Sequence, residues 1–202
     1  MERTEHDYYQ SLYQIAAVVN SIGAPGAILR AIVENVARAL EAKGCSLLLL
    51  SPDRKQLLPT TAYGLSDQFV RKGPLSADKS IAEALVGTPV AVFDATKDKR
   101  IQYQEETRKE GIASILSVPI TLREEVIGVI RAYTAEPRHF TTDDMYFVSA
   151  VANLGAIALE NAQLYESIQQ DYTACRQEML AGHAAEVYQW LGEDYIAPPP
   201  EE

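Results

Sequence analysis

Helical periodicity marks the N-terminal part of the chain. Between residues 5 and 22, apolar side chains recur at steps of three and four residues, as on one face of an amphipathic helix. They are Tyr9, Leu12, Ala16, Val19 and Ile22. A second helix is predicted from Pro25 to Lys43, because proline suits the first helical turn and Gly44 suits the position after the last.

Short apolar runs bounded by turn residues predict the strands of a sheet. They cover residues 45–51, 56–64 and 89–94, and a hairpin over 113–134 follows them. Pro59 argues that the second strand lies at a sheet edge, because proline cannot donate a ladder hydrogen bond. Short helices are predicted between the strands, at 66–71, 79–86 and 103–110.

A long helix is predicted after Thr141, which forms a capping box with Asp144 three residues later. One apolar face of this helix carries Phe147, Ala150, Leu154, Ile157, Leu164 and Ile168. The other face carries Val148, Val151, Gly155, Ala158, Ala162 and Tyr165. A helix that is apolar on two sides is buried on both, so one face is expected to cover the sheet. The other is expected to pack on a second helix, from this chain or from a second copy. A looser stripe continues towards Trp190, with Gly182 as a candidate break.

Composition narrows the class of protein. The chain has 202 residues, 47 % of them apolar, which suits one domain with a sizeable core. Its net charge of −10, without a basic block, makes nucleic acid a poor partner. The sequence has no recognisable signal peptide or apolar run of membrane-spanning length, and Cys45 and Cys175 are expected to be free thiols. A cytoplasmic protein without membrane contact is therefore predicted.

Four pieces in the second half of the chain resemble those of the GAF domain family. They are Ser114 to Pro119 (SILSVP), Val126 to Ile130 (VIGVI), Phe140 to Asp144 (FTTDD) and Ala156 to Ala162 (AIALENA). Their order and spacing also match the family, and the resemblance covers about residues 25 to 166.

The resemblance implies an α+β, GAF-like fold. In such a fold, long helices pack on one face of an antiparallel sheet of five to six strands, and loops with short helices close a pocket on the other. The chain then divides into an N-terminal amphipathic helix (1–24), the GAF domain (25–166), a helical extension (167–192) and a disordered proline-rich tail (193–202). GAF domains are mostly sensory or dimerising modules of signalling proteins, and their ligands vary widely.

The sequence lacks the residues that mark several GAF chemistries. Bilin attachment uses a pocket cysteine, often beside a histidine, but there is no cysteine between Cys45 and Cys175 and no histidine between His6 and His139. Relatives that bind cyclic nucleotides carry an Asn-Lys pair, which is missing here. Phe140 is accordingly expected to be a core anchor.

No catalytic or metal site is predicted. Relatives similar to free methionine sulfoxide reductases need several pocket cysteines, whereas Cys45 opens an apolar strand and is expected to be buried and inert. An axial haem ligand would have to be His139, in a turn, or His183, on a helix stripe. The sequence also lacks a Ser/His/Asp arrangement, metal-ligand spacing and a phosphate-binding glycine loop. The protein is therefore predicted not to be an enzyme and to have no resident cofactor.

Arg131 stands where a core strand would normally carry an aliphatic residue. Strand side chains alternate between two faces, which groups Arg131 with Ile127, Val129 and Tyr133. The opposite face holds small residues that suit close packing of helices, so the Arg131 face is assigned to the pocket. With Ser117 on the neighbouring strand, the predicted pocket wall is Ser117, Arg131 and Tyr133.

A guanidinium in such a wall must be paired, because an isolated buried charge is unstable. One hypothesis is an anionic ligand, a carboxylate or phosphate, which matches the forked guanidinium. The other is an internal salt bridge with Asp94 or with a glutamate of the 105–110 helix. Phe93, Tyr103 and Tyr63 are candidate aromatic walls of the same pocket.

Two functions remain open at this point. The first is a small-molecule-sensing regulatory module of a bacterial-type signalling system. It would bind an unknown anionic small molecule and signal to a separate protein through dimerising terminal helices. The second is a ligand-free dimerisation or interaction module, in which the pocket is filled core. The apolar stripes at 9–22 and 164–179 favour a homodimer in both cases.

Overall fold

The computed structural model describes residues 5–20, 25–77 and 82–191. By their contacts, the residues form two units, one that ends at Glu160 and one that begins at Asn161. Ile22 of the predicted first stripe and the predicted tail over 193–202 lie outside the described residues.

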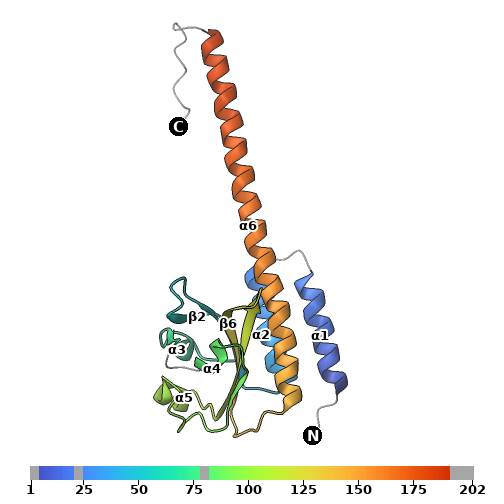
Figure 1. The fold of residues 1–202 in the computed structure, drawn as a ribbon, viewed down its shortest axis with the longest axis vertical. Coiled ribbons are helices and arrows are strands. Elements are labelled where there is room, and N and C mark those ends of the chain that lie inside the picture. The colour runs from blue at the N-terminus through green and yellow to red at the C-terminus, as the bar shows by residue number, and fades with distance from the viewer. Residues whose placement is uncertain (1–4, 21–24, 78–81, 192–202) are drawn as a thin grey trace. The chain divides into compact units, whose positions relative to one another are not determined.

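The first unit is built around a six-stranded antiparallel sheet with the strand order β3-β2-β1-β6-β5-β4 (Figure 1). The strands are β1 (Gly44–Leu50), β2 (Gln56–Tyr63), β3 (Leu75–Ser76), β4 (Val90–Val92), β5 (Ser114–Leu122) and β6 (Glu125–Thr134). All strands except the two-residue β3 coincide with short apolar runs that are bounded by turn residues, which is the pattern that predicts strands. The sequence did not predict β3. The α+β architecture with an antiparallel sheet of five to six strands, expected from the sequence, is confirmed.

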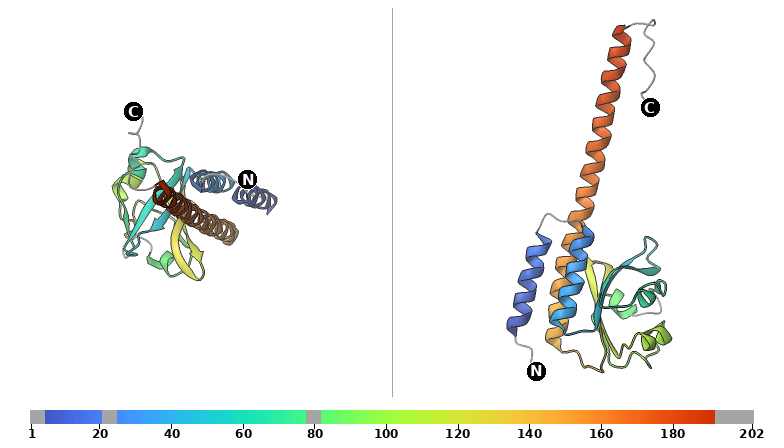
Figure 2. Two further views of the ribbon diagram at one scale, coloured as in Figure 1. Left: turned by 90° about the horizontal axis from the view of Figure 1, so that it is seen from above. Right: turned by 180° about the vertical axis from the view of Figure 1, so that it is seen from behind.

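Helices cover both faces of this sheet, as Figures 1 and 2 show. On one face lie α2 (Pro25–Ala39) and the first part of α6 (Thr142–Leu191), and α1 (Glu5–Val19) packs against α2. On the other face lie the short helices α3 (Asp67–Val70), α4 (Ala82–Leu85) and α5 (Gln104–Lys109). The sheet therefore separates a layer of long helices from a layer of loops and short helices.

Two apolar cores lie on the two sides of the sheet. The helix-side core joins the long helices to the sheet and includes Ile32 and Val148. The loop-side core lies under the short helices and includes Phe69. Alternate residues of β6 enter opposite cores, Ile130 the first and Val129 the second, because strand side chains alternate. This two-sided burial fixes the register of the central strands, since a one-residue slip would exchange the two faces.

The predicted capping box begins α6. The Asp144 backbone N–H donates to Thr141 Oγ1 at 3.1 Å, and the Thr141 N–H donates to Asp144 Oδ2 at 2.8 Å. Further along, a Cβ placed on Gly155 would lie 3.8 Å from Ile32. The small residues on this face of α6 therefore allow α2 to pack closely against it. α2 is thus the second helix that the apolar pattern of α6 predicted.

The N-terminal helix buries only part of the predicted stripe. Ile15 and Val19 are buried, Tyr8 and Leu12 pack against the same core, and Tyr9 is 67 % exposed. Leu12 and Val19 therefore lie on the buried face as predicted, whereas the prediction for Tyr9 is wrong. Residues 8, 12, 15 and 19 also follow helical spacing, and the aromatic stack of Tyr8 on Phe147, with ring centroids 4.5 Å apart, favours this second stripe.

Two bulges exchange the faces of individual strand residues. The register of β2 against β1 shifts between Leu47 and Leu48, where Thr60 is the extra residue. The register of β6 against β5 shifts between Ile120 and Thr121, where Ile127 is the extra residue. Side chains alternate between the two faces along a strand, so one extra residue reverses this alternation for the residues beyond it, relative to the partner strand. Ile127 consequently contacts the helix-side core, and its predicted place beside Val129 is wrong.

The second unit is described by the helical residues from Asn161 onwards. α6 continues through Gly182 to Leu191, so the candidate break at this glycine does not form. The apolar side chains of Leu164, Tyr165, Ile168 and Tyr172 are all more than half exposed. Among the described residues, no helix has the length and apolar character needed to cross a membrane.

Candidate functional site

The three central strands bring Ser46, Arg131 and Ser117 into one row. Arg131 of β6 pairs with Ser46 of β1 on one side and with Ser117 of β5 on the other. Arg131 is buried, with 4 % of its surface exposed, and Tyr133 on the same face belongs to the loop-side core. The predicted face of Arg131 is confirmed, and Ser117 lies opposite it as the predicted pocket wall assumed.

Hydrogen bonds hold this row together. Arg131 Nε donates to Ser117 Oγ at 3.2 Å, and the hydroxyls of Ser46 and Tyr133 bond at 2.9 Å. Burial lowers the pKa of Arg131, while its interaction with the Tyr133 hydroxyl opposes that change. Burial likewise raises the pKa of Tyr133, so its phenol stays protonated. The row therefore presents one cation and neutral hydroxyls on the loop side of the sheet.

A small cavity lies between this row and the layer above it. It is lined by Phe69, Lys72, Leu75, Ile101, Gln102, Tyr103, Thr107, Ile115, Arg131 and Tyr133. Its volume is about 10 Å³, which is room for roughly one water molecule. A ligand of several atoms would enter only if the outer wall moved.

Lys72 is a second cation at this cavity, and the sequence analysis did not identify it. Its Nζ donates to the Phe69 carbonyl at 2.9 Å and lies 3.6 Å from the centre of the Phe69 ring. Burial, followed by the charge of Arg131, lowers the pKa of Lys72 to about 8, against the raising effect of Glu110 and Glu106. Lys72 follows α3 in a loop, where no periodicity indicates the direction of a side chain.

The outer wall of the cavity is closed by a contact between two loops. Tyr103 Oη donates to the Pro74 carbonyl at 3.1 Å, and Thr107 Oγ1 donates to the Tyr103 carbonyl at 2.7 Å. Gly73 has a φ of +116°, and a Cβ there would lie 3.0 Å from the Tyr103 hydroxyl. Glycine therefore allows the two loops to approach each other at this point.

Three other predicted site residues lie elsewhere. Tyr63 packs against the helix-side core, because the bulge at Thr60 turns it away from the loop side, so its predicted place in the pocket wall is wrong. Phe93 is 46 % exposed and stacks on His139, with ring centroids 4.2 Å apart. Asp94 accepts from Thr96 at 2.6 Å and pairs with a lysine at 2.9 Å.

The candidate carboxylates for an internal salt bridge have other partners. Asp94 is held by Lys97, Glu105 pairs with Lys109, and Glu110 accepts from Ser66. Within the described part of the chain, neither Asp94 nor a glutamate of the 105–110 segment lies within ion-pair distance of Arg131. The predicted internal pair with these residues is not formed.

Among the described residues that line the small cavity there is no cysteine or histidine. Cys45 is fully buried on the helix side, and burial raises its pKa far above the ordinary range, so the thiol is inert. Cys175 is exposed and free in the second unit. In the described ranges, no group of His, Cys, Asp and Glu is placed to hold a metal ion.

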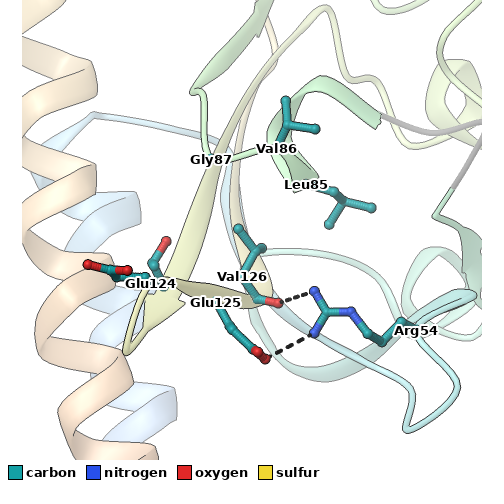
Figure 3. A pocket seen from close by; sticks show the side chains of 8 residues that line it. Arg54, Leu85, Val86, Gly87, Glu124, Glu125 and Val126 are labelled. Carbon is teal, nitrogen blue, oxygen red and sulfur yellow. Dashed lines mark hydrogen bonds and ion pairs between the residues drawn. The ribbon is translucent and has the colours of Figure 1, made fainter.

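A larger open hollow lies at the other end of the sheet, between the β1–β2 turn, the β5–β6 turn and α4 (Figure 3). Its volume is about 660 Å³. Arg54 lies along its wall, where it donates to the Val126 carbonyl at 3.2 Å and pairs with Glu125 at 3.7 Å. Leu85 and Val86 form the apolar side. Arg54, the one arginine among the described lining residues of this hollow, is thus engaged within the wall.

Comparison with known families agrees with this architecture. The family model of the GAF domain matches residues 24–159, which is most of the chain. The chain belongs to the GAF domain family. The match spans the sheet, both helical layers and the small cavity, so the resemblance seen in the sequence is confirmed.

Individual GAF relatives share low sequence identity with the chain. An uncharacterized sensor-like histidine kinase of Chloroflexus aurantiacus is 24 % identical over 193 residues, which are 95 % of this chain and 31 % of that protein. The chain thus spans about a third of the length of this curated relative.

Solved structures show the same fold. The GAF domain of a phosphoenolpyruvate-protein phosphotransferase from Coxiella burnetii aligns with a TM-score of 0.71 and 21 % identity, over 80 % of this chain and 98 % of that one. The free methionine-R-sulfoxide reductase of Neisseria meningitidis, solved with its substrate, aligns with a TM-score of 0.67 and 16 % identity, over 82 % and 96 %. At these identities the likeness establishes the fold alone. GAF domains are sensory and regulatory modules of signalling proteins, and that general role applies to this chain.

Proposed function

We propose that this protein is a small-molecule-sensing regulatory module of a bacterial-type signalling system, and that it is not an enzyme. It binds an anionic small molecule in the cavity between the central strands and the layer of short helices. It reports binding through its long helices to a separate signalling protein in the cytoplasm.

The observation that carries this proposal is the placement of Arg131. Arg131 has 4 % of its surface exposed and faces a cavity rather than the helix-side core. Burying a guanidinium among aliphatic strand residues costs desolvation free energy. Its fork of N–H donors matches a carboxylate or a phosphate. Lys72 at the same cavity adds a second positive charge.

Ligand binding requires the outer wall to open. The hydrogen bond between Tyr103 and the Pro74 carbonyl joins two irregular segments, and such segments open more readily than the strands of a sheet. The reductase of Neisseria meningitidis was solved with its substrate, which supports the idea that this fold can admit a small molecule. The absence of a cysteine pair at the cavity supports binding rather than redox chemistry here.

The exposed apolar residues of the long helices support a homodimer. Tyr9 and Tyr13 of α1 and Ile168 and Tyr172 of α6 are each about two-thirds or more exposed. Stripes of this kind on helices favour association with a second copy. A change of geometry in such a dimer would pass the binding signal to the partner protein.

A ligand-free dimerisation module is the second candidate. The cavity volume of about 10 Å³ favours it, because a cavity of this size is close to filled core. In this case the serine–arginine row is a structural network, and the long helices alone carry the function.

Calorimetric titration with small anions separates the two candidates. Wild-type protein, Arg131→Met and Arg71→Met are titrated with formate, sulfate and malonate. Arg71 is an exposed arginine beside α3, so its substitution controls for loss of one positive charge. The sensor proposal predicts binding to the wild type and to Arg71→Met, and loss of binding in Arg131→Met. Absence of binding to all three proteins would favour the ligand-free module.

A further inference from the structure

The second unit presents an apolar face on a single helix. From Asn161 onwards, the described residues of this unit all belong to α6. Backbone hydrogen bonds alone stabilise an isolated helix only marginally, and most helices in proteins are held by the packing of an apolar face. Four apolar side chains here, Leu164, Tyr165, Ile168 and Tyr172, are between 54 % and 67 % exposed. This part of α6 therefore needs a partner for its apolar face.

The spacing along this face is that of a coiled coil. Exposed side chains follow one another at steps of three, four and three residues, at Tyr165, Ile168, Tyr172 and Cys175. Such alternating steps keep a line of side chains facing a second helix that winds around the first. In the heptad notation abcdefg, the two tyrosines take position a, and Ile168 and Cys175 take position d. The f positions on the far side are all glutamine, at residues 163, 170 and 177.

Two opposite charges flank this apolar line. Asp171 takes position g, and Arg176 takes position e five residues later. In a parallel pair of helices, position g of one chain faces position e of the next heptad in the other chain. Two-fold symmetry would thus form the Asp171–Arg176 pair twice, once on each side. Both side chains are exposed, and neither has an oppositely charged residue three or four positions away on its own helix.

We propose that residues 161–177 of α6 form a parallel, in-register coiled coil with a second copy of this chain, in which Asp171 pairs with the partner's Arg176. This inference rests on the homodimer of the proposed function and names the segment, the direction and the charges that form it. An antiparallel pair would place g beside g and e beside e, so the opposite charges would not meet. A helix of another protein would have to supply both complementary charges, which a second copy supplies by symmetry.

Cys175 reports the direction and the register of such a pair. In a parallel, in-register pair, position d of one helix faces position d of the other, so the two Cys175 side chains meet. In an antiparallel pair, position d faces position a instead. A disulfide forms only when the two Cα atoms approach within about 7 Å. Cys175 is free and exposed in the single chain, whereas Cys45 is buried and does not compete with it.

Oxidative cross-linking of the full chain tests the pairing. The oxidant is copper phenanthroline in air, which takes two electrons from each pair of thiolates and leaves one disulfide. Non-reducing electrophoresis then measures the covalent dimer. The wild type should cross-link, and Cys175→Ser should not. The double variant Cys175→Ser/Gln170→Cys moves the thiol to position f, and it should cross-link at least about tenfold more slowly than the wild type, because position f lies away from the partner.

Charge reversal tests the ion pair itself. Asp171→Arg and Arg176→Asp each place like charges opposite one another twice, so each should raise the dissociation constant of the dimer on the order of tenfold at low salt. An equal mixture of the two variants should recover wild-type affinity, because each reversed charge then faces an opposite charge in the other chain. Light scattering over a dilution series measures these dissociation constants.

Contrary results separate two failures. A wild-type dimer that does not cross-link, or that cross-links no faster than the Gln170→Cys variant, would overturn the parallel pairing and leave the homodimer standing. Charge-reversed variants that do not recover on mixing would also overturn the proposed pairing. A wild-type monomer at all concentrations would overturn both the coiled coil and the homodimer.

Discussion

Arg131 of β6 and Ser117 of β5 lie opposite each other, and Arg131 Nε donates to Ser117 Oγ at 3.2 Å. The hydroxyl thereby orients the guanidinium within the central sheet. On the other side, Ser46 occupies the paired position of β1 and bonds Tyr133. The polar row is therefore built into the three central strands, and it faces the layer of loops and short helices.

Substitutions in this row should separate binding from stability. Arg131→Met replaces a buried charge with an apolar chain of similar length, so the protein should stay folded, with unfolding free energy changed by about 2 kcal/mol or less. Anion binding should fall by at least about tenfold. Ser117→Ala removes only the orienting hydroxyl and should cost about 1 kcal/mol of stability. Urea unfolding and calorimetry measure the two quantities.

The matched control for these variants is Arg71→Met, at an exposed position outside the row. If Arg131→Met failed to fold while Ser117→Ala was fully stable, the guanidinium would be a structural group. Unchanged anion affinity in a folded Arg131→Met protein would show that Arg131 does not bind the anion.

The wall formed by Tyr103 should control ligand entry. Tyr103→Phe removes the hydrogen bond to the Pro74 carbonyl but keeps the ring, so the two loops should separate more easily. Association should become several-fold faster with little change in overall stability. Stopped-flow mixing or NMR exchange with sulfate measures this rate. Tyr146→Phe, at a 71 % exposed position of α6, is the control and should leave it unchanged.

Asp144 joins α1, α6 and the preceding loop. It caps α6 with Thr141, and its Oδ1 accepts from Tyr8 and from Arg138, the latter at 2.6 Å. Asp144→Ala should therefore lower the unfolding free energy by about 2 to 3 kcal/mol, through loss of the cap and of charge-assisted hydrogen bonds. Tyr8→Phe should cost about 1 kcal/mol. Asp143→Ala, at an exposed neighbouring position, should have little effect.

The contribution of Asp144 should depend on pH. Burial acts to raise its pKa, but the hydrogen bonds from Tyr8, Thr141 and Arg138 lower it overall. A carboxylate with a lowered folded-state pKa stabilises the protein above its ordinary value near 3.8 and loses that effect as the pH falls through the folded value. The stability difference between wild type and Asp144→Asn should thus shrink below about pH 4. A difference that stayed constant to pH 2 would contradict this assignment.

The exposed stripe of α6 should carry dimerisation. Ile168→Glu places a charge on the stripe, whereas Gln170→Glu places the same charge on a polar exposed position. Light scattering should show twice the chain mass of 22.3 kDa for wild type and for Gln170→Glu, and a shift to monomer for Ile168→Glu. A wild-type monomer at all concentrations would reject the homodimer.

Much of the fold could be predicted because periodicity and turn chemistry act locally. Strand alternation correctly gave the face of Arg131 and Tyr133. The pairing of Arg131 with Ser117 was only assumed, and it depends on the bulge at Ile127, because a count from the hairpin turn would place Ile130 opposite Ser117. The capping box of Thr141 and Asp144 was likewise visible at a spacing of three residues. These features depend on neighbours in sequence.

The missed features depend on the three-dimensional structure. The bulge at Thr60 reverses the face of Tyr63, and no spacing in a single sequence reveals such an extra residue. Lys72 reaches the cavity from an irregular loop after α3. In α1, the stripes through Tyr8 and through Tyr9 have equal periodicity, and only the stack on Phe147 distinguishes them.

Native mass spectrometry of gently purified wild type and Arg131→Met, before and after incubation with sulfate, phosphate and malonate, tests the central claim most directly. The account predicts that the wild type gains a small, reproducible mass, that Arg131→Met does not, and that both proteins form the same oligomer. An equal added mass on the two proteins would contradict it, and so would a wild type that gains no mass under any of these conditions.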